Sequence, residues 1–330
     1  MQQLELFANT EKDKITFDLF KAYFDARKNK RSTINALAFE KHFEANIFAL
    51  CSEIIDNRYK PQPSICFIVD KPVKREIFAA DFRDRVVHHL IYNYISPIFE
   101  RAFINDSYSC RIGKGTHYGI KRIDHFIRSC SQNYTRDCYI LKLDIKGYFM
   151  AMNKSLLYEK VKEELINQKL KIDFDLPLVL NLIEKTIFND PRVSCIIKGI
   201  KTDWVGLPET KSLFHAKPNC GLPIGNLTSQ LFGNIYMNAF DHWVKRDLGI
   251  TYYGRYVDDF VLVHSDKEFL KTRIALIRKY LDETLNLELH PNKIYLQHFS
   301  KGVQYLGAII KPHRVYVANR TKGNFYEAIE

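Results

Sequence analysis

Three aspartates stand in apolar surroundings, which is an unusual place for an acid. Asp144 lies near the end of an apolar run, and Asp258 and Asp259 separate the apolar runs 250–257 and 260–264. An Asp-Asp pair between strands can serve as a turn, but tight hairpins favour Asn-Gly or Asp-Gly, and no glycine follows here. If Asp144 lies beside the pair, three like charges repel one another strongly in a poorly hydrated site.

A hard divalent cation with oxygen ligands would offset this repulsion. Two such ions about 3.5–4 Å apart can bind both the attacking and the leaving oxygen of an in-line displacement. One ion lowers the pKa of a primer 3′-hydroxyl, and the other neutralises pyrophosphate as it leaves. The pattern therefore predicts nucleotidyl transfer, with turn formation as the alternative role of the acids.

The composition favours a folded protein with a nucleic-acid partner. The chain has 330 residues, of which 46% are hydrophobic, so it can form one large core or two or three subdomains. Its net charge of +11 favours a polyanionic partner, although ordinary solvated lysines and arginines explain this charge equally well. The 19 Tyr and 23 Phe can fill a core or stack on bases.

Other chemistry is disfavoured by the residue spacing. The seven cysteines form no CxxC pair or zinc spacing, so we expect reduced thiols in a cytosolic protein. The eleven histidines contain no HExxH cluster. Residues 1–14 lack the pattern of a signal peptide, and no apolar run reaches membrane-spanning length. These features predict a cytoplasmic protein without a membrane partner.

The acids need a scaffold, and the hydrophobic patterns predict one of mixed strands and helices. The expected strands are 65–69, 75–78, 139–145, 250–257, 260–264 and short runs around 293–296 and 304–310. The expected helices lie within 1–59, at 84–99, within 146–188, at 226–248 and after Ser265. This irregular alternation predicts an α+β fold with helices packed on one face of a sheet.

Local signals mark several of the expected boundaries. Gly249 is a stop for the helix before it, and Ser265 with Glu268 forms a candidate capping box for the next helix. Residues 105–116 form a basic, glycine-rich loop that either approaches a phosphate or is simply a solvated turn. Residues 190–220 show no period, and long irregular segments are usually functional or mobile.

Over most of the chain, from about position 68 to position 310, the motifs and their order resemble the reverse transcriptases. The sequence Tyr-Val-Asp-Asp ending at Asp259 matches the family's YxDD signature, and Leu-Asp-Ile-Lys-Gly-Tyr-Phe around Asp144 looks like its first catalytic motif. The resemblance implies two Mg²⁺ ions, for which Mn²⁺ can substitute. The implied metal ligands are Asp144, Asp258, Asp259 and the backbone carbonyl of Ile145.

The same resemblance implies roles in binding the incoming nucleotide. Arg75 would clamp the triphosphate with two guanidinium donors, and Lys74 would assist it or simply be solvated. Phe149, five positions after Asp144, falls where the family keeps an aromatic ring that excludes a ribose 2′-hydroxyl, with core packing as the alternative. Lys293 is placed to protonate or neutralise pyrophosphate, as a further catalytic residue.

Residues 224–230, Ile-Gly-Asn-Leu-Thr-Ser-Gln, depart from the pattern QGxxxSP of most reverse transcriptases. Ile224 replaces the glutamine and Gln230 replaces the proline. This variant resembles the enzymes of diversity-generating retroelements, which copy a template-repeat RNA and misincorporate opposite its adenines. A glutamine can hydrogen-bond the nucleotide sugar and an isoleucine cannot, so a weaker positioning contact would lower fidelity. Ile224, Gly225 and Gln230 are therefore expected to bind the dNTP.

The C-terminal motif resembles a primer-grip hairpin, which would hold the primer end by backbone contacts. It comprises Tyr305, Leu306 and Gly307. Few residues follow it, so we expect a reduced thumb. The missing clamp implies outside help, and the family resemblance supplies two candidates. These are structured RNA around the template and a small basic helical accessory protein.

The resemblance as a whole implies a right-hand polymerase fold with fingers and a palm, in which helices back an antiparallel palm sheet. The expected segments are an N-terminal helical segment at 1–60, fingers at 61–135, a palm at 136–300 with an insertion loop at 190–220, and the primer grip with a short thumb remnant at 301–330. The expected partners are an RNA template, an RNA/DNA hybrid and dNTPs, in a bacterial or phage-encoded system. Two alternatives remain open: a retron-type or antiphage-defence reverse transcriptase, and a catalytically inactive basic RNA-binding scaffold.

Overall fold

The computed structural model describes residues 10–28 and 33–329. The expected N-terminal helical segment is therefore described in part, and the absence of a signal peptide in the first residues lies outside what is described. The chain divides into two compact units, each described here by itself. The first comprises Met1–Arg101 and Lys154–Phe232, and the second comprises Ala102–Asn153 and Gly233–Glu330.

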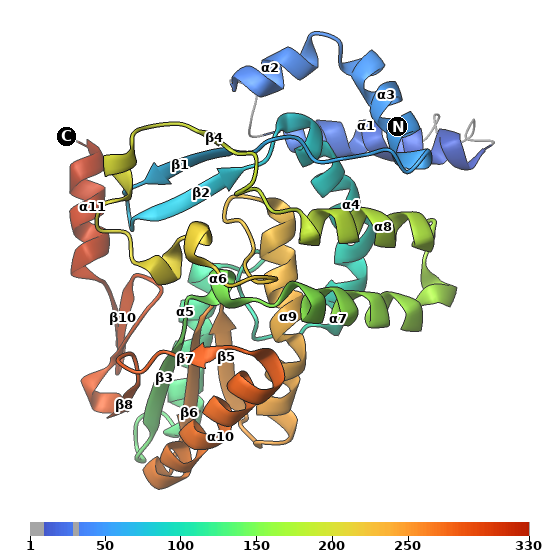
Figure 1. Cartoon of the computed structure of the whole chain (residues 1–330). Coiled ribbons are helices and arrows are strands. Elements are labelled where there is room, and N and C mark those ends of the chain that lie inside the picture. Colours follow the sequence, from blue (N-terminus) through green and yellow to red (C-terminus); the bar gives the residue numbers. More distant parts are fainter. Residues whose placement is uncertain (1–9, 29–32, 330) are drawn as a thin grey trace. The chain divides into compact units, whose positions relative to one another are not determined.

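The first unit is mostly helical (Figure 1). Its helices are α1 (Glu11–Arg27), α2 (Ile34–Glu40), α3 (Phe43–Ile55), α4 (Phe82–Ala102, of which the last residue belongs to the second unit), α7 (Lys154–Asn167), α8 (Leu176–Phe188) and the start of α9 (Leu227–Arg246). Thr10 caps α1, because its side chain accepts from the Asp13 N–H and Asp13 reciprocates. The apolar stripe of α3 is buried at Ile47, Leu50 and Ile54.

A three-stranded sheet completes the first unit. Strands β1 (Ile65–Val69) and β2 (Arg75–Ala79), both predicted, pair antiparallel, and β4 (Ile196–Ile197) pairs parallel with the free side of β1. The pairing positions Ile65 opposite both Ala79 and Ile196. The irregular segment after α8 is thus anchored to the sheet at one point by backbone hydrogen bonds.

Buried Glu76 anchors the same segment at a second point. It lies on β2 and is 1% exposed. Its carboxylate accepts hydrogen bonds from the Trp204 indole at 2.7 Å, the Ser212 hydroxyl at 2.8 Å and the Leu213 N–H at 2.6 Å. Residues 190–220 were expected to be structureless, but they contain β4 and three short 3₁₀ helices, η3 (Lys201–Trp204), η4 (Glu209–Lys211) and η5 (Leu213–His215).

The second unit is built on a five-stranded sheet in the order β5-β6-β3-β7, in which β8 also pairs with β3. Its strands are β3 (Tyr139–Lys146), β5 (Tyr252–Tyr256), β6 (Asp259–His264), β7 (Glu288–Leu289) and β8 (Tyr295–His298). Every pairing is antiparallel. A separate sheet joins β9 (Val303–Tyr305), β10 (Ala308–Lys311) and β11 (Arg314–Val317).

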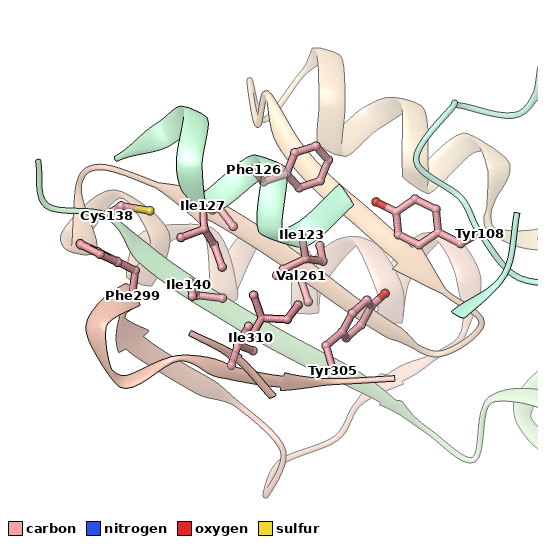
Figure 2. Close-up of a cluster of buried hydrophobic side chains, with 12 residues drawn as sticks. Tyr108, Ile123, Phe126, Ile127, Cys138, Ile140, Val261, Phe299, Tyr305 and Ile310 are labelled. Carbon is pink, nitrogen blue, oxygen red and sulfur yellow. The ribbon is translucent and has the colours of Figure 1, made fainter. Parts of the chain in front are cut away.

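Both faces of the central strands are covered, rather than the one face that was expected. On one face, Ile140 and Val261 pack with Ile123 and Phe126 of α5 (Thr116–Cys130) and with Tyr305, in the cluster drawn in Figure 2. On the other face, the ring of Phe260 lies 5.5 Å from that of Phe240 in α9. Strands buried on both faces show continuous apolar runs instead of alternation, which explains why β3 and β6 were easy to predict.

The remaining helices of the second unit are α6 (Tyr148–Ala151), α10 (Lys267–Leu285) and α11 (Asn319–Ile329). The predicted capping box at Ser265 is wrong by one residue, because the Asp266 carboxylate accepts from the N–H groups of Glu268 and Phe269. Four apolar residues of α10 are buried and Ile274 is half-buried; the buried ones are Leu270, Ile277, Leu281 and Leu285. Strand β11 and helix α11 were not predicted.

None of the helices in the described part of the chain combines the length and the apolar composition that a membrane crossing requires.

We predict that Glu76→Ala loosens residues 201–213. It leaves the buried donors of Trp204 and Ser212 unpaired, so the free energy of unfolding should fall by about 3 kcal/mol. Limited proteolysis should cut this segment faster, and chemical denaturation should give the stability change. Glu209→Ala, an exposed change in the same segment, should stay within about 0.5 kcal/mol of the parent protein. If the protease cut both variants at the same rate, Glu76 would not be the residue that anchors residues 201–213.

Candidate active site

The pairing of β3 with β6 brings the first and last of the three aspartates face to face. Asp144 lies directly opposite Asp259 in the antiparallel register. Asp259 is also opposite Tyr256 across β5 and β6, so Val257 and Asp258 alone form the connecting turn. The Ile145 N–H donates to the Asp258 carbonyl at 3.1 Å, which ties this turn to β3. The structure thus brings together the three acids and Ile145 at one end of the sheet.

The turn adopts a strained backbone conformation. Val257 has a φ of +56°, in the left-handed region. A two-residue hairpin favours this region, but for an L-residue it costs roughly 1–2 kcal/mol, and a β-branched side chain makes it rarer still. No glycine relieves the strain, so surrounding contacts must hold the turn in place.

A buried ion pair provides such a contact. Arg255 is fully buried and donates to the two carboxylate oxygens of Asp241 at 2.8 and 2.7 Å. Its third nitrogen, Nη1, donates to the Val257 carbonyl at 2.9 Å. Burial lowers the pKa of Arg255, but the charge of Asp241 and its hydrogen bonds outweigh burial and raise the pKa overall. Arg255 therefore keeps its positive charge inside the protein.

Two lysines provide positive charge for the acids. The Lys293 ammonium donates to Asp144 Oδ2 at 2.9 Å, and the Lys142 ammonium lies 3.3 Å from Asp259 Oδ2. Burial lowers the pKa of Lys293, but its hydrogen bond to Asp144 and the charges of the three aspartates together outweigh burial, so the net shift is upward. Lys293 thus remains protonated beside the acid that it neutralises.

The acids still repel one another. The pKa of Asp258 is raised to about 6, first by burial and then by the charges of Asp144 and Asp259. The pKa of Asp259 is also raised, chiefly by burial, with Lys142 acting in the opposite direction. Asp258 is the acid of the three for which no partner cation lies within ion-pair distance in the described residues. The surroundings of Asp258 and Asp259 therefore oppose the ionisation of these two carboxyl groups.

The atoms around the carboxylates test whether a divalent cation fits. Asp259 Oδ1 is buried, and within residues 10–28 and 33–329 it has no hydrogen-bond partner. A hard cation satisfies such an oxygen. Across the same residues, no three His, Cys, Asp or Glu side chains are already gathered around one point as a metal cluster. Carboxylate oxygens are the ligands that Mg²⁺ prefers, so the three acids fit this ion. Lys293 and Lys142 contact two of the three carboxylates, those of Asp144 and Asp259.

Phe149 lies in the same unit as the acids. Its ring is half-buried and meets that of Tyr148 edge-on at a centroid distance of 5.1 Å. The Tyr148 hydroxyl donates to the Gly233 carbonyl at 2.7 Å, and a side chain at position 233 would lie within 3.4 Å of the Phe149 ring. The rings of Tyr148 and Phe149 thus lie close to Gly233 of α9, and part of the Phe149 ring stays exposed.

The residues predicted to bind the nucleotide, other than Phe149, belong to the first unit. The Ile224 carbonyl accepts from the Phe78 N–H at 2.9 Å, which joins the Ile-Gly-Asn motif to β2. Gly225 has a φ of +116°, and a Cβ there would lie 2.8 Å from a methyl group of Ile77. Only glycine fits this contact. Gln230 is exposed on α9.

The two basic candidates of the first unit differ in their surroundings. Arg75 is exposed at the first position of β2, so its guanidinium is accessible to a polyanion. Lys74 donates to the Val205 carbonyl at 2.8 Å and lies 3.3 Å from an Asp70 oxygen. These contacts give Lys74 a structural role.

The predicted primer-grip residues form a tight hairpin turn. Tyr305 pairs with Ala308, and Leu306 and Gly307 between them have φ of +48° and +82°. The Tyr305 side chain is fully buried in the hydrophobic cluster of Figure 2, and Leu306 packs against that cluster. The part of this motif that could meet a ligand is its backbone and not its side chains.

The basic loop before α5 is held by its own chain. Arg111 donates to the carbonyls of Ile104 and Ser107 at 2.7 and 2.9 Å, and the Lys114 ammonium bonds Asn105. This favours the structural interpretation of that loop over phosphate binding.

Sequence reasoning missed Lys142, Arg255 and Asp241. Lys142 has a weak signal, because on a strand the residue two positions before Asp144 faces the same side. Arg255 stands two residues before the turn in an otherwise apolar strand, which marks it as a buried charge in need of a partner. Asp241 has no such signal, since only the fold brings α9 to β5.

Comparisons with known proteins agree with this geometry. A family model described as reverse transcriptase (RNA-dependent DNA polymerase) matches residues 70–310, more than half of the chain. The chain is 22% identical to Protein YkfC of Escherichia coli (strain K12), over 83% of this chain and 73% of that protein. It is 21% identical to nuclear intron maturase 1, mitochondrial, of Arabidopsis thaliana, over 74% of this chain and 42% of the maturase.

Solved structures of telomerase share the fold. The apo telomerase of Candida tropicalis, truncated from its C-terminal domain, matches with a TM-score of 0.52 and 13% identity over 81% of this chain. Telomerase from Candida albicans, in complex with a fragment of telomeric RNA, matches with a TM-score of 0.52 and 12% identity over 84% of this chain. The chain spans 58% and 51% of these two telomerase chains.

The antiparallel sheets, their covering helices and the telomerase likeness are those of a right-hand polymerase fold. Since the family match spans most of the chain and the whole of the sheet that carries the three aspartates, the chain belongs to the reverse transcriptase family, the RNA-dependent DNA polymerases.

Proposed function

We propose that this RNA-directed DNA polymerase copies a template-repeat RNA into cDNA for a diversity-generating retroelement, with errors concentrated at template adenines. The observation that carries the polymerase role is the pairing of Asp144 with Asp259 beside the Asp258 turn. The diversity-generating role is supported by the sequence of the 224–230 motif. In the wider proposal, residues 61–135 are fingers, 136–300 are palm, and 301–330 are primer grip and thumb remnant.

Reverse transcriptases generally use divalent ions, commonly Mg²⁺. In our proposal Asp144, Asp258, Asp259 and the Ile145 carbonyl hold two of them. Bound there, the ions would activate the primer 3′-hydroxyl and neutralise the pyrophosphate. The chain's own part is to present carboxylates from two paired strands in a fixed register. Lys293, which pairs with Asp144, supplies a proton or a positive charge near the leaving group.

Other residues select the nucleotide. The exposed guanidinium of Arg75 is suited to clamp a triphosphate, because its planar fork matches phosphate oxygens. The half-buried ring of Phe149 is suited to exclude a 2′-hydroxyl, because it is bulky, lies against Tyr148 and keeps part of its surface exposed. Ile224 is half-buried and its side chain offers no hydrogen bond to the sugar.

The proposed partners are an RNA template, the RNA/DNA hybrid, dNTPs and a small basic helical accessory protein. The net charge of +11 supports a polyanionic partner. A solved telomerase of the same fold is in complex with telomeric RNA, which supports an RNA partner here.

We predict that Asp258→Asn abolishes cDNA synthesis and stabilises the protein at neutral pH. The pKa of Asp258 is about 6 when folded and about 4 when unfolded. Because the folded state disfavours the ionised form, stability is lost as the pH rises from about 4 through about 6. In EDTA at pH 8 the variant should be more stable by about 1–3 kcal/mol, and at pH 4 the two proteins should differ little.

Thermal unfolding with and without Mg²⁺ checks this prediction. Mg²⁺ should raise the melting temperature of the parent protein and leave that of Asp258→Asn unchanged, because binding to the folded state stabilises it. Persistent cDNA synthesis in the variant would refute the metal assignment.

We predict that Ile224→Gln lowers misincorporation opposite template adenine by about 2- to 10-fold, the effect of one hydrogen bond of about 0.5–1.5 kcal/mol. The measurement is sequencing of cDNA from a primed RNA template, with and without the accessory protein. Ile224→Leu keeps an apolar side chain and should keep the error pattern. Accurate cDNA from the parent protein would instead place it in a retron-type or antiphage-defence branch.

We predict that Phe149→Val raises incorporation of ribonucleotides relative to dNTPs by about 10- to 100-fold, because the ring no longer fills the space of a 2′-hydroxyl. Single-nucleotide extension assays with each nucleotide measure this ratio. Tyr148→Phe removes the hydroxyl bonded to Gly233 but keeps the neighbouring ring, and it should leave the ratio unchanged. If Phe149→Val discriminated between ribonucleotides and dNTPs as well as the parent protein does, the ring would have a packing role only.

A further inference from the structure

The peptide bond that leads into Asp258 is held by a buried guanidinium. Arg255 Nη1 donates to the Val257 carbonyl at 2.9 Å. That carbonyl and the Asp258 N–H belong to one planar peptide unit. Fixing the carbonyl therefore fixes the direction in which the chain enters Asp258, and with it the starting point of the Asp258 side chain.

The turn needs this hold because it is not stable by itself. Val257 has a φ of +56°, which an L-residue with a branched side chain seldom adopts. The two-residue turn, Val257-Asp258, contains no glycine or asparagine to make that conformation easy. Without a hydrogen-bond partner for the Val257 carbonyl, Val257 would be free to relax to an ordinary negative φ. Such a relaxation would turn the Asp258 carboxylate away from Asp144 and Asp259.

The guanidinium is itself immobile. Its Nε and Nη2 bind the two oxygens of Asp241 at 2.8 and 2.7 Å, and the Tyr253 hydroxyl donates to the same carboxylate at 2.6 Å. Arg255 and Asp241 are 0% and 1% exposed, so water does not compete for these bonds. The main chain of Arg255 is fixed as well, because its N–H donates to the Asp106 carbonyl at 2.9 Å.

We propose that Arg255, locked by Asp241, is a positioning residue for nucleotidyl transfer that orients Asp258 through the Val257 carbonyl. It touches neither nucleotide nor primer, and it acts on the turn alone. This inference rests on the proposed metal-binding role of Asp258.

The first test is Arg255→Lys, which keeps the positive charge but cannot reach both Asp241 and the Val257 carbonyl with a planar fork. We expect kcat to fall by about 10- to 100-fold, the usual effect of removing a group that orients a metal ligand. The Mg²⁺ concentration for half-maximal activity should rise, and the KM for dNTP should stay within a factor of about two, because nucleotide binding is not altered.

The second test is rescue by Val257→Gly in the Arg255→Lys background. Glycine adopts positive φ without steric cost, so the turn needs less support. We expect the double variant to recover at least half of the lost kcat on a logarithmic scale. A purely structural role of Arg255 in the core predicts no recovery, since Val257→Gly adds no contact to the core.

A matched control separates positioning from stability. Arg192, in the first unit, bonds both carboxylate oxygens of Asp190 at 2.8 and 2.6 Å and donates to the Ala216 carbonyl at 3.0 Å, and none of these contacts involves Asp106 or the turn. Arg192→Lys should lower the melting temperature while leaving kcat and the Mg²⁺ dependence unchanged. If Arg255→Lys melts lower but keeps the parent's kcat and Mg²⁺ dependence, the positioning role is refuted. Failure of Val257→Gly to restore any activity in a folded double variant also refutes it.

A binding readout keeps this inference distinct from the proposed function. The midpoint of Mg²⁺-induced thermal stabilisation should shift to higher Mg²⁺ in Arg255→Lys and return in the double variant. If the parent protein made no cDNA but showed these shifts, the proposed function would fail while the orienting role stood. If the parent made cDNA and the midpoints did not shift, the orienting role would fail alone.

Discussion

Three carboxylates share one end of an apolar sheet, and their mutual repulsion is the constraint that the surrounding structure answers. Burial and the neighbouring acids raise the pKa of Asp258 to about 6, so its ionised form is disfavoured where it is placed. Lys293 and Lys142 neutralise the acids on either side. Such an arrangement reduces stability, a compromise common at functional sites.

Strain adds to this electrostatic cost. The turn between β5 and β6 contains a valine at positive φ, and the ion pair that contacts it is fully buried. The buried pair need not add net stability, because desolvation of two charges is expensive. Its value lies in fixing one peptide unit in a defined orientation. The Arg255–Asp241 pair therefore contributes more to the geometry of the turn than to the stability of the protein.

Sequence alone predicted the acids and most of the elements that present them. Strands β3 and β6 are buried on both faces, so their apolar runs are unmistakable, and the acids stand out within them. Partners that are distant in sequence could not be predicted in this way. Asp241 and Arg255 meet only because α9 packs beside β5, and Glu76 finds Trp204 and Ser212 across a segment without periodicity. The local sequence pattern predicts a helix or a strand, whereas the contacts of a buried charged side chain depend on the tertiary fold.

The register of β3 and β6 has a consequence for how this gene can change. Neighbouring residues on a strand point to opposite faces, so Asp144 and Leu143 cannot exchange places without inverting the whole strand. One codon inserted or deleted within either strand would present a leucine or phenylalanine where Asp144 meets Asp259. These strands can therefore vary by substitution and not by length. The segment at 190–220, which is anchored by β4 and Glu76, can change length between its anchors with little effect on either, so natural variants of this enzyme should differ in size there.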